Sequence, residues 1–280
     1  MSYQDILYAA QNGVAVITLN RPEALNAWRA EMERDVRAAM TEAARDEAVR
    51  VIVLTGAGRG FCAGADMKGL QSTVAAAQDG KPAGVAPARV APGPGPFDPN
   101  SREDFQRQYS YFPAVPKPII AAINGACAGL GMVMALYADL RFASDAAKFT
   151  TAFSRRGLIA EHGVSWLLPR LVGFANAADL LFSARVVLAP EAKALGLVSR
   201  VIPHQTFEDE VMAYARMLAA EVSPRSLREM KREIWNAQFQ GLGEAIDSAN
   251  ADMKGSFTSE DFKEGVAHFV EKRRPAFTGR

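Results

Sequence analysis

The sequence predicts a mixed α/β protein whose C-terminal part is mostly α-helical. Two segments, Val51–Leu70 and Ile119–Leu140, share one layout of an apolar strand, a glycine-rich turn and a helix. Beyond Ser165 the apolar residues follow a helical pattern instead. With 280 residues and 49% hydrophobic content, the chain can bury the substantial core of one globular domain.

The first predicted elements are a hairpin, a helix and a strand. Asn12-Gly13 tolerates the positive φ angles of a tight turn between two strand-like runs. After Pro22, apolar residues recur every four positions with charges between them, which predicts an amphipathic helix. A continuous apolar run then predicts a strand that is buried on both faces. In order, these elements are the strands Ile6–Ala10 and Val14–Leu19, the helix Asn26–Asp46 and the strand Val51–Thr55.

A segment rich in proline and glycine, from Gly80 to Asn100, supports neither helix nor sheet and is predicted to be a loop, as a lid or a spacer. The insertion as a whole is placed at about residues 71–104. After it, the apolar patterns resume and predict the strands Ile119–Ile123, Leu140–Ser144 and Lys148–Phe153 and the helices Met132–Leu140, Ala175–Ser183, Pro190–Leu195, Phe207–Ala220 and Pro224–Phe239.

Charge and cysteine content exclude several classes of protein. Lys and Arg total 32 against 31 for Asp and Glu, so no global field favours nucleic acid or a membrane surface. Cys62 and Cys127 show no metal-ligand or disulfide spacing, which favours a reducing, cytoplasmic setting. The N-terminus lacks the pattern of a secretory signal, and no apolar run reaches membrane-spanning length.

Each glycine-rich turn is a candidate site for an anion or an oxyanion. Glycine lets backbone N–H groups face a ligand closely, and the first N–H groups of a helix have no partner within the helix. The run Gly56–Phe61 superficially matches a dinucleotide-binding fingerprint, but Phe61 stands where that fingerprint needs its last glycine. A tight strand-to-helix turn explains this run better.

Six blocks of sequence resemble the crotonase superfamily, the enoyl-CoA hydratase/isomerase family, in order and spacing. The resemblance implies a spiral of ββα units over residues 1–200 and a C-terminal helical part, residues 201–280, that forms a homotrimer or a dimer of trimers. It also implies an acyl-CoA substrate, with coenzyme A as part of the substrate and no metal or other cofactor. The blocks are RPEALNAW (21–28), GRGFCAGADM (58–67), KPIIAAINGACAGLG (117–131), ADLRFAS (138–144), LPRLVG (168–173) and AKALGLVSRV (192–201).

The resemblance also assigns site residues. Charge that develops on a thioester oxygen is stabilised by two preorganised N–H donors, which fall on Ala65 and Leu130. A leucine in place of the usual glycine still supplies its backbone N–H. The remaining expected substrate contacts are Ala24, Leu25, Ala63, Asp66, Met67, Gly129 and Phe153.

The chain departs from the family's hydratases at two positions. Val133 and Phe153 stand where those enzymes carry two glutamates, and neither side chain can transfer a proton. Hydration by the usual pair of carboxylates is therefore not expected. Glu161, in the segment RRGLIAEHG, matches the point at which some double-bond isomerases of the family carry their acidic residue.

A lone carboxylate suits isomerisation, since one group can take a proton from one carbon and return it two carbons away. We therefore expect Glu161 to be the acid/base of an enoyl-CoA isomerase, with a pKa raised by apolar surroundings. Alternatives stay open: a hydratase, a hydrolase or dehalogenase that uses Glu161 as a nucleophile, and a catalytically weak CoA-ester binding protein. Glu161 could also be an ordinary surface glutamate paired with a nearby arginine. The sequence does not define the acyl group of the substrate.

Overall fold

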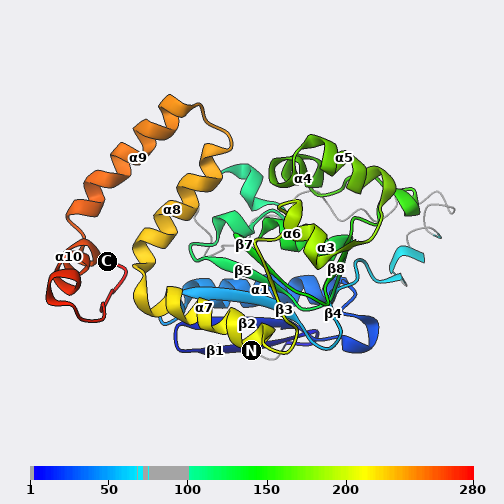
Figure 1. The fold of residues 1–280 in the computed structure, drawn as a ribbon, viewed down its shortest axis with the longest axis horizontal. Helices are drawn as coiled ribbons and strands as arrows, with labels where there is room; N and C mark the ends of the chain where they lie inside the picture. Colours follow the sequence, from blue (N-terminus) through cyan, green and yellow to red (C-terminus); the bar gives the residue numbers. More distant parts are fainter. Residues whose placement is uncertain (1–2, 68, 72–74, 76–100) are drawn as a thin grey trace.

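The computed structural model describes residues 3–67, 69–71, 75 and 101–280. A six-stranded sheet with the order β1-β2-β3-β5-β7-β10 forms the centre, and a smaller sheet has the order β4-β6-β8-β9 (Figure 1). The large sheet contains β1 (Ile6–Gln11), β2 (Val14–Leu19), β3 (Val51–Gly56), β5 (Ile119–Ile123), β7 (Leu140–Ser144) and β10 (Arg200–Ile202). The small sheet contains β4 (Gly60–Cys62), β6 (Ala126–Ala128), β8 (Lys148–Thr150) and β9 (Val187–Leu188).

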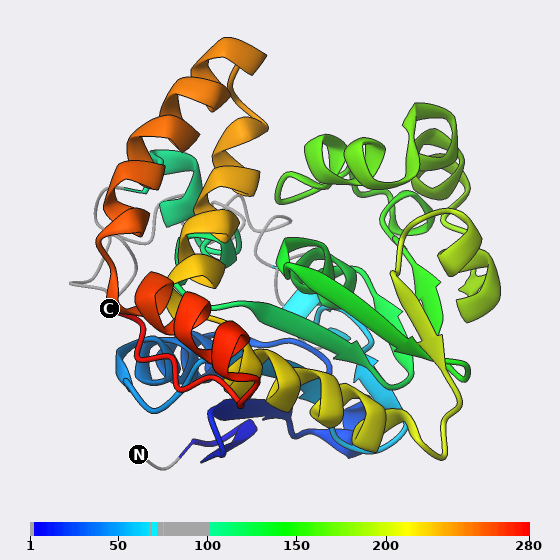
Figure 2. The same ribbon diagram turned by 60° about the vertical axis from the view of Figure 1, so that its left-hand side comes forward.

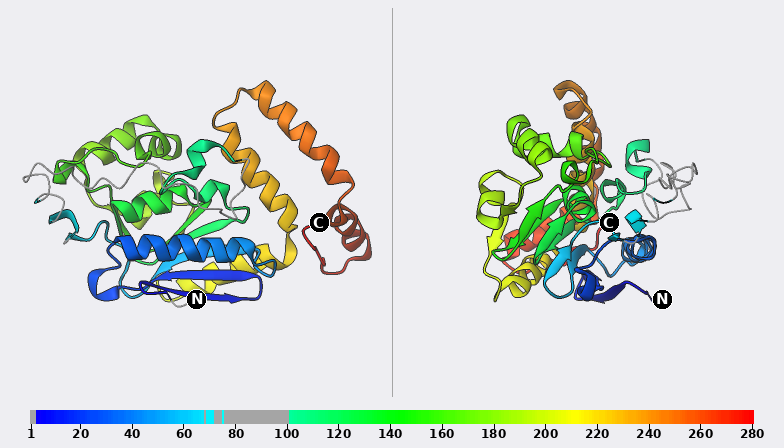
Figure 3. Two further views of the ribbon diagram at one scale, coloured as in Figure 1. Left: turned by 180° about the vertical axis from the view of Figure 1, so that it is seen from behind. Right: turned by 90° about the vertical axis from the view of Figure 1, so that its right-hand side faces the viewer.

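Both faces of the large sheet are covered, as the continuous apolar runs predicted. Ile52 and Leu54 of β3 belong to the same core as the buried face of α1 (Ala30–Arg45), which lies in front in the left view of Figure 3. The alternate residues Val51 and Val53 pack into a second core with α7 (Phe207–Glu221). Successive side chains of a strand point to opposite faces, so β3 contributes to both cores.

A repeated step from one sheet to the other generates the spiral. The strands β3, β5 and β7 pair in parallel in the large sheet, and the strand that follows each of them, β4, β6 or β8, pairs in parallel in the small sheet. The helix α3 (Leu130–Tyr137) follows the second of these pairs. The repeated strand–strand step with this helix confirms the expected spiral of ββα units.

Several predicted boundaries need correction. The helix expected at Met132–Leu140 is Leu130–Tyr137, because Leu140 already pairs with β5. The strand expected to reach Phe153 ends at Thr150, and Phe153 adopts a helical backbone before a short 3-10 turn. Trp28, assigned to the first helix, precedes it in extended pairing with Ala65. The expected loop at residues 80–100 lies outside the described residues.

The C-terminal half is helical, as predicted. Its helices α8 and α9 extend from one end of the sheet, while α4 and α5 cover another side (Figures 1 and 2). Among the described helices, none combines the length and apolarity needed to cross a membrane. These helices are α4 (Val164–Val172), α5 (Phe174–Ser183), α6 (Ala189–Ala194), α7 (Phe207–Glu221), α8 (Pro224–Ala237), α9 (Leu242–Phe257) and α10 (Glu260–Glu271).

Candidate active site

The two glycine-rich turns meet in space although 65 positions separate Gly64 from Gly129 in the sequence. 

Gly64 and Gly129 lie next to each other: a Cβ atom added to Gly129 would lie 3.6 Å from the Cα atom of Gly64. Both glycines have positive φ angles, +101° and +49°, which residues with a side chain rarely adopt. The parallel pairing of β4 with β6 brings the turns together. Ala65 and Leu130, the predicted donors, directly follow these two glycines.

The backbone N–H groups of Ala65 and Leu130 have no hydrogen-bond partner among the residues that the structure describes. The backbone N–H of Trp28 donates to the Gly64 carbonyl at 2.7 Å, and the Trp28 carbonyl accepts from the Asp66 N–H at 2.9 Å. These two bonds lie on either side of Ala65 and do not use its N–H. Leu130 is the first residue of α3, where an N–H has no partner inside the helix. Within the described part of the chain, neither N–H donates to a backbone carbonyl. Two donors on adjacent turns suit a developing oxyanion.

The predicted coenzyme A contacts gather beside the first turn. Asn26 is fully buried, and its side-chain amide donates to the carbonyl groups of Ala57 at 2.9 Å and Gly60 at 2.8 Å. These bonds fix the turn that contains Leu25, whose carbonyl accepts from the Ala63 N–H at 3.0 Å. Ala24, the end of a short 3-10 turn, directly precedes Leu25. Sequence reasoning missed Asn26 as the residue that holds this arrangement.

An ion pair holds the segment that follows Ala65. Asp66 forms an ion pair with Arg21, with 2.9 Å between Oδ2 and Nη1, and both side chains are largely buried. Arg21 also donates to the Ala27 carbonyl at 2.6 Å. Met67, the last predicted contact on this segment, is 55% exposed, so its side chain is accessible to a ligand.

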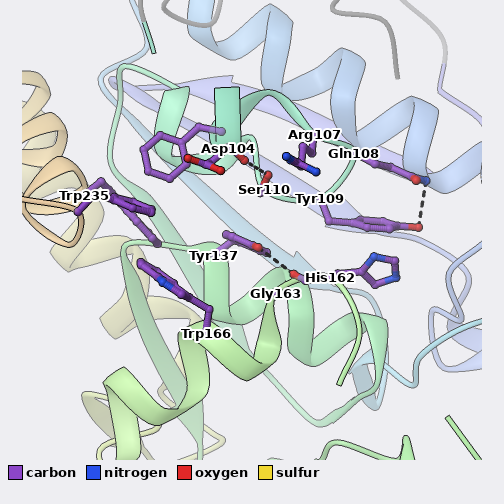
Figure 4. A pocket seen from close by; sticks show the side chains of 12 residues that line it. Asp104, Arg107, Gln108, Tyr109, Ser110, Tyr137, His162, Gly163, Trp166 and Trp235 are labelled. Atoms are coloured by element: carbon purple, nitrogen blue, oxygen red, sulfur yellow. Dashed lines mark hydrogen bonds between the residues drawn. The ribbon is translucent and has the colours of Figure 1, made fainter. Parts of the chain in front are cut away.

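Glu161 lies in the loop that precedes α4 and is partly buried. Its carbonyl accepts from the Val164 N–H at 3.1 Å, which fixes the loop to the start of the helix. The hydroxyl of Tyr137, at the end of α3, donates to the His162 carbonyl at 2.8 Å (Figure 4). His162 has a positive φ angle of 53°, and this bond holds that sharp bend in place. The loop of the candidate acid is therefore anchored to the helix that begins at Leu130.

Burial shifts both titratable groups of this loop toward their neutral forms. It raises the pKa of Glu161 above its ordinary value, as the sequence predicted, and lowers the pKa of His162. The His162 Nε2 atom lies 3.8 Å from the Glu161 Oε2 atom. A neutral imidazole at pH 7 leaves the carboxylate without a cationic neighbour on this side, which strengthens it as a base when it is ionised.

The two positions at which hydratases carry glutamates are apolar and buried here. Val133 lies on α3, one turn from Leu130, and Phe153 packs in the same core. The Phe153 carbonyl accepts from the Leu158 N–H at 3.0 Å, so Phe153 holds the beginning of the loop that leads to Glu161. Phe153 is buried, and its phenyl ring cannot transfer a proton; that it contacts the substrate stays a prediction.

Tyr109 is a site residue that sequence reasoning missed. Its buried ring lies edge-on to His162, with 4.3 Å between ring centroids, and edge-on to Trp28 at 6.4 Å. Its hydroxyl accepts from the Gln108 side chain at 3.2 Å. The segment Tyr109–Phe112 contains three aromatic residues, but no local pattern in the sequence indicates that Tyr109 packs between Trp28 and His162, which are distant in the chain.

Comparison with known proteins identifies the family of the chain. The sequence pattern of the family described as Enoyl-CoA hydratase/isomerase matches residues 9–87 and 90–280. The chain therefore belongs to the enoyl-CoA hydratase/isomerase family, and its fold is the crotonase-like spiral that the resemblance predicted. In the part of the chain that the structure describes, no three His, Cys, Asp or Glu side chains form a group that could hold a metal ion.

Individual relatives carry different names. The 1,2-epoxyphenylacetyl-CoA isomerase of Escherichia coli K12 is 35% identical over 98% of each chain. A Rhodobacter capsulatus protein named "Probable enoyl-CoA hydratase" is 38% identical over the full length of both chains. A solved enoyl-CoA hydratase/isomerase from Mycobacterium paratuberculosis superposes with a TM-score of 0.82, at 28% identity over both full chains. These names include both hydratases and an isomerase.

Proposed function

We propose that the chain is an enoyl-CoA isomerase that moves a double bond by proton transfer through Glu161. The substrate carbonyl oxygen would accept from the N–H groups of Ala65 and Leu130, which would stabilise the enolate formed when Glu161 removes a proton from one carbon. Glu161 would then return the proton two carbons away. The observation that carries this proposal is the raised pKa of Glu161 in a loop anchored to the helix that begins at Leu130, with Val133 and Phe153 at the positions of the hydratase glutamates.

The test is a comparison of two substrates. We expect the protein to isomerise 3-hexenoyl-CoA, and replacement E161Q to lower kcat by about 10²- to 10⁴-fold, because the amide cannot accept the proton. Replacement of the exposed Glu208 by Gln is the matched control and is expected to leave kcat unchanged. Hydration of crotonyl-CoA without isomerisation of 3-hexenoyl-CoA would overturn the proposal.

Hydration is the second candidate, because the Rhodobacter capsulatus relative is named a hydratase.

Two further outcomes would indicate other chemistry. A transient ester on Glu161, detected by rapid quench and mass spectrometry, would indicate a nucleophile and favour a hydrolase or dehalogenase. Full turnover by the E161Q variant would exclude Glu161 as the acid/base, while absence of turnover on every substrate would favour a CoA-ester binding protein.

The remaining predictions on assembly and location extend this proposal. The C-terminal helices would join three copies into a homotrimer, or two such trimers into a hexamer, and the exposed apolar side chains of α9 and α10 support this. The absence of a metal or cofactor beyond the coenzyme A of the substrate, and a cytoplasmic location, stay predictions from the sequence.

A further inference from the structure

A cavity of ≈ 440 Å³ opens beside the loop that carries Glu161. The segment 104–110, the end of α3, the beginning of α4 and the end of α8 enclose it (Figure 4). Half of its twelve lining residues are aromatic, which is a high share for a chain in which 9% of all residues are Phe, Trp or Tyr. These residues are Phe105, Tyr109, Tyr137, Trp166, Trp235 and Phe239.

The cavity is continuous with the loop of the candidate acid. His162 and Gly163, the two residues after Glu161, form part of its wall. Tyr109 and Tyr137 reach this wall from two other segments: the Tyr109 ring packs against the His162 imidazole, and the Tyr137 hydroxyl binds the His162 carbonyl. A group bound in the cavity would therefore contact the loop that carries Glu161.

The aromatic rings hold one another in place. Trp166 stacks on Phe239 with 4.9 Å between centroids and an angle of 15° between their planes. Phe105 lies edge-on to Trp235 at 5.9 Å and to Phe239 at 5.8 Å. The wall thus presents ring faces and ring edges in fixed orientations before a ligand arrives. A planar aromatic ring can add further stacked and edge-on contacts of the same kind, which an aliphatic chain of equal size cannot.

Polar residues occupy the remainder of the wall. Arg107 is exposed and Asp104 is half-buried, and both line the cavity. The Ser110 hydroxyl is already bonded to the Asp104 carbonyl, and the Gln108 amide donates to Glu33 at 2.6 Å. With these two polar groups already bonded within the protein, the aromatic surface is the part of the wall suited to an acyl group.

We propose that this cavity binds the acyl group of the substrate and favours an acyl group that carries an aromatic ring. The inference rests on the proposed function, because it takes the ligand to be an acyl-CoA thioester. It adds the substrate class: aryl-substituted thioesters over open-chain or alicyclic thioesters of the same size.

Binding of thioesters without a double bond tests this independently of turnover. Isothermal titration would compare phenylacetyl-CoA with cyclohexylacetyl-CoA, and 4-phenylbutanoyl-CoA with 4-cyclohexylbutanoyl-CoA, at matched carbon number. We expect the aryl member of at least one pair to bind about fivefold more tightly. Equal or weaker binding of the aryl member in both pairs would overturn the inference.

Two variants test whether the ring binds in this cavity. W166L and F105L each remove one aromatic surface of the wall, so the aryl preference is expected to fall below about twofold. F182L is the control, because Phe182 is 81% exposed on α5 and does not line the cavity. An unchanged preference in both cavity variants would contradict the assignment, and the wild-type comparison decides the matter if either variant fails to fold.

The outcomes separate this inference from the proposed function. Binding of all four thioesters without an aryl preference, together with isomerisation of 3-hexenoyl-CoA, would overturn only the inference. An aryl preference in a protein that does not isomerise any 3-enoyl-CoA would support the cavity assignment and overturn the proposed reaction. Binding of every thioester no tighter than coenzyme A itself would overturn the inference.

Discussion

The ring of Tyr109 packs edge-on against the imidazole of His162, with 4.3 Å between their centroids. The same ring contacts Trp28, whose backbone pairs around Ala65. Tyr109 therefore bridges the segment that presents one candidate oxyanion donor and the loop that presents the candidate acid. Its position makes it a positioning residue, since it acts on both groups through their neighbours.

Replacement Y109L should lower kcat for isomerisation by about tenfold or more, because a small displacement of the acid relative to the donors is costly. Y109F keeps the ring and is expected to retain most of the activity. The measurement is steady-state kinetics on folded protein, with the effect expected in kcat more than in KM. Equal losses in both variants would show that the hydroxyl matters and the ring contact does not.

The pH profile should report the raised pKa of Glu161. The carboxylate must be ionised to accept a proton, so kcat/KM is expected to fall as the pH drops through a value above the ordinary 4.5 of a glutamate. His162 titrates below its ordinary 6.5, because burial lowers its pKa, and it could produce a similar limb. H162N separates the two: the acid limb should persist in this variant, and its disappearance would assign the limb to the histidine.

Gly131 should not tolerate a side chain. A Cβ atom there would lie 2.3 Å from the Cys62 carbonyl oxygen, which belongs to β4 and cannot move freely. G131A is expected to lower the free energy of unfolding by about 1–3 kcal/mol, measured by urea denaturation, and to displace the beginning of α3 with its free N–H.

The matched control for this replacement is G243A. No atom lies within 4 Å of the corresponding Cβ position in α9, and alanine favours helix. The free energy of unfolding should stay unchanged or rise by up to about 1 kcal/mol. Equal destabilisation by both replacements would contradict the close approach of α3 to β4.

Self-association should bury apolar residues of the last two helices. Phe269 is 78% exposed on α10, and other apolar residues of α9 and α10 are exposed with it. Light scattering after size exclusion is expected to give three or six times the mass of one chain, and F269D is expected to shift this mass downward. A monomer for the wild-type protein at micromolar concentration would contradict the proposed trimer. K272E, a charge change at the end of the same helix, is the control.

Periodicity predicted the ranges of most long elements up to α8, but it gave no ranges for α9, α10 or the shortest strands. The hairpin around Asn12-Gly13 formed as expected, with positive φ angles at both residues. The strands β4 and β6 are three residues each and lie inside the glycine-rich turns, so they are too short for an alternating pattern. The helix α4 was not predicted, because its run is short and contains Pro169.

The sequence by itself determined the two glycine-rich turns, the residues that follow them and the lone glutamate at position 161, because motif spacing is a local property. Only the tertiary structure decided that Gly64 touches Gly129 and that Tyr109 lies against His162. Such contacts depend on which strands pair and which helices cover them, and this is set by packing of the whole core. The sequence of one segment does not identify the segment that it will contact in the folded protein.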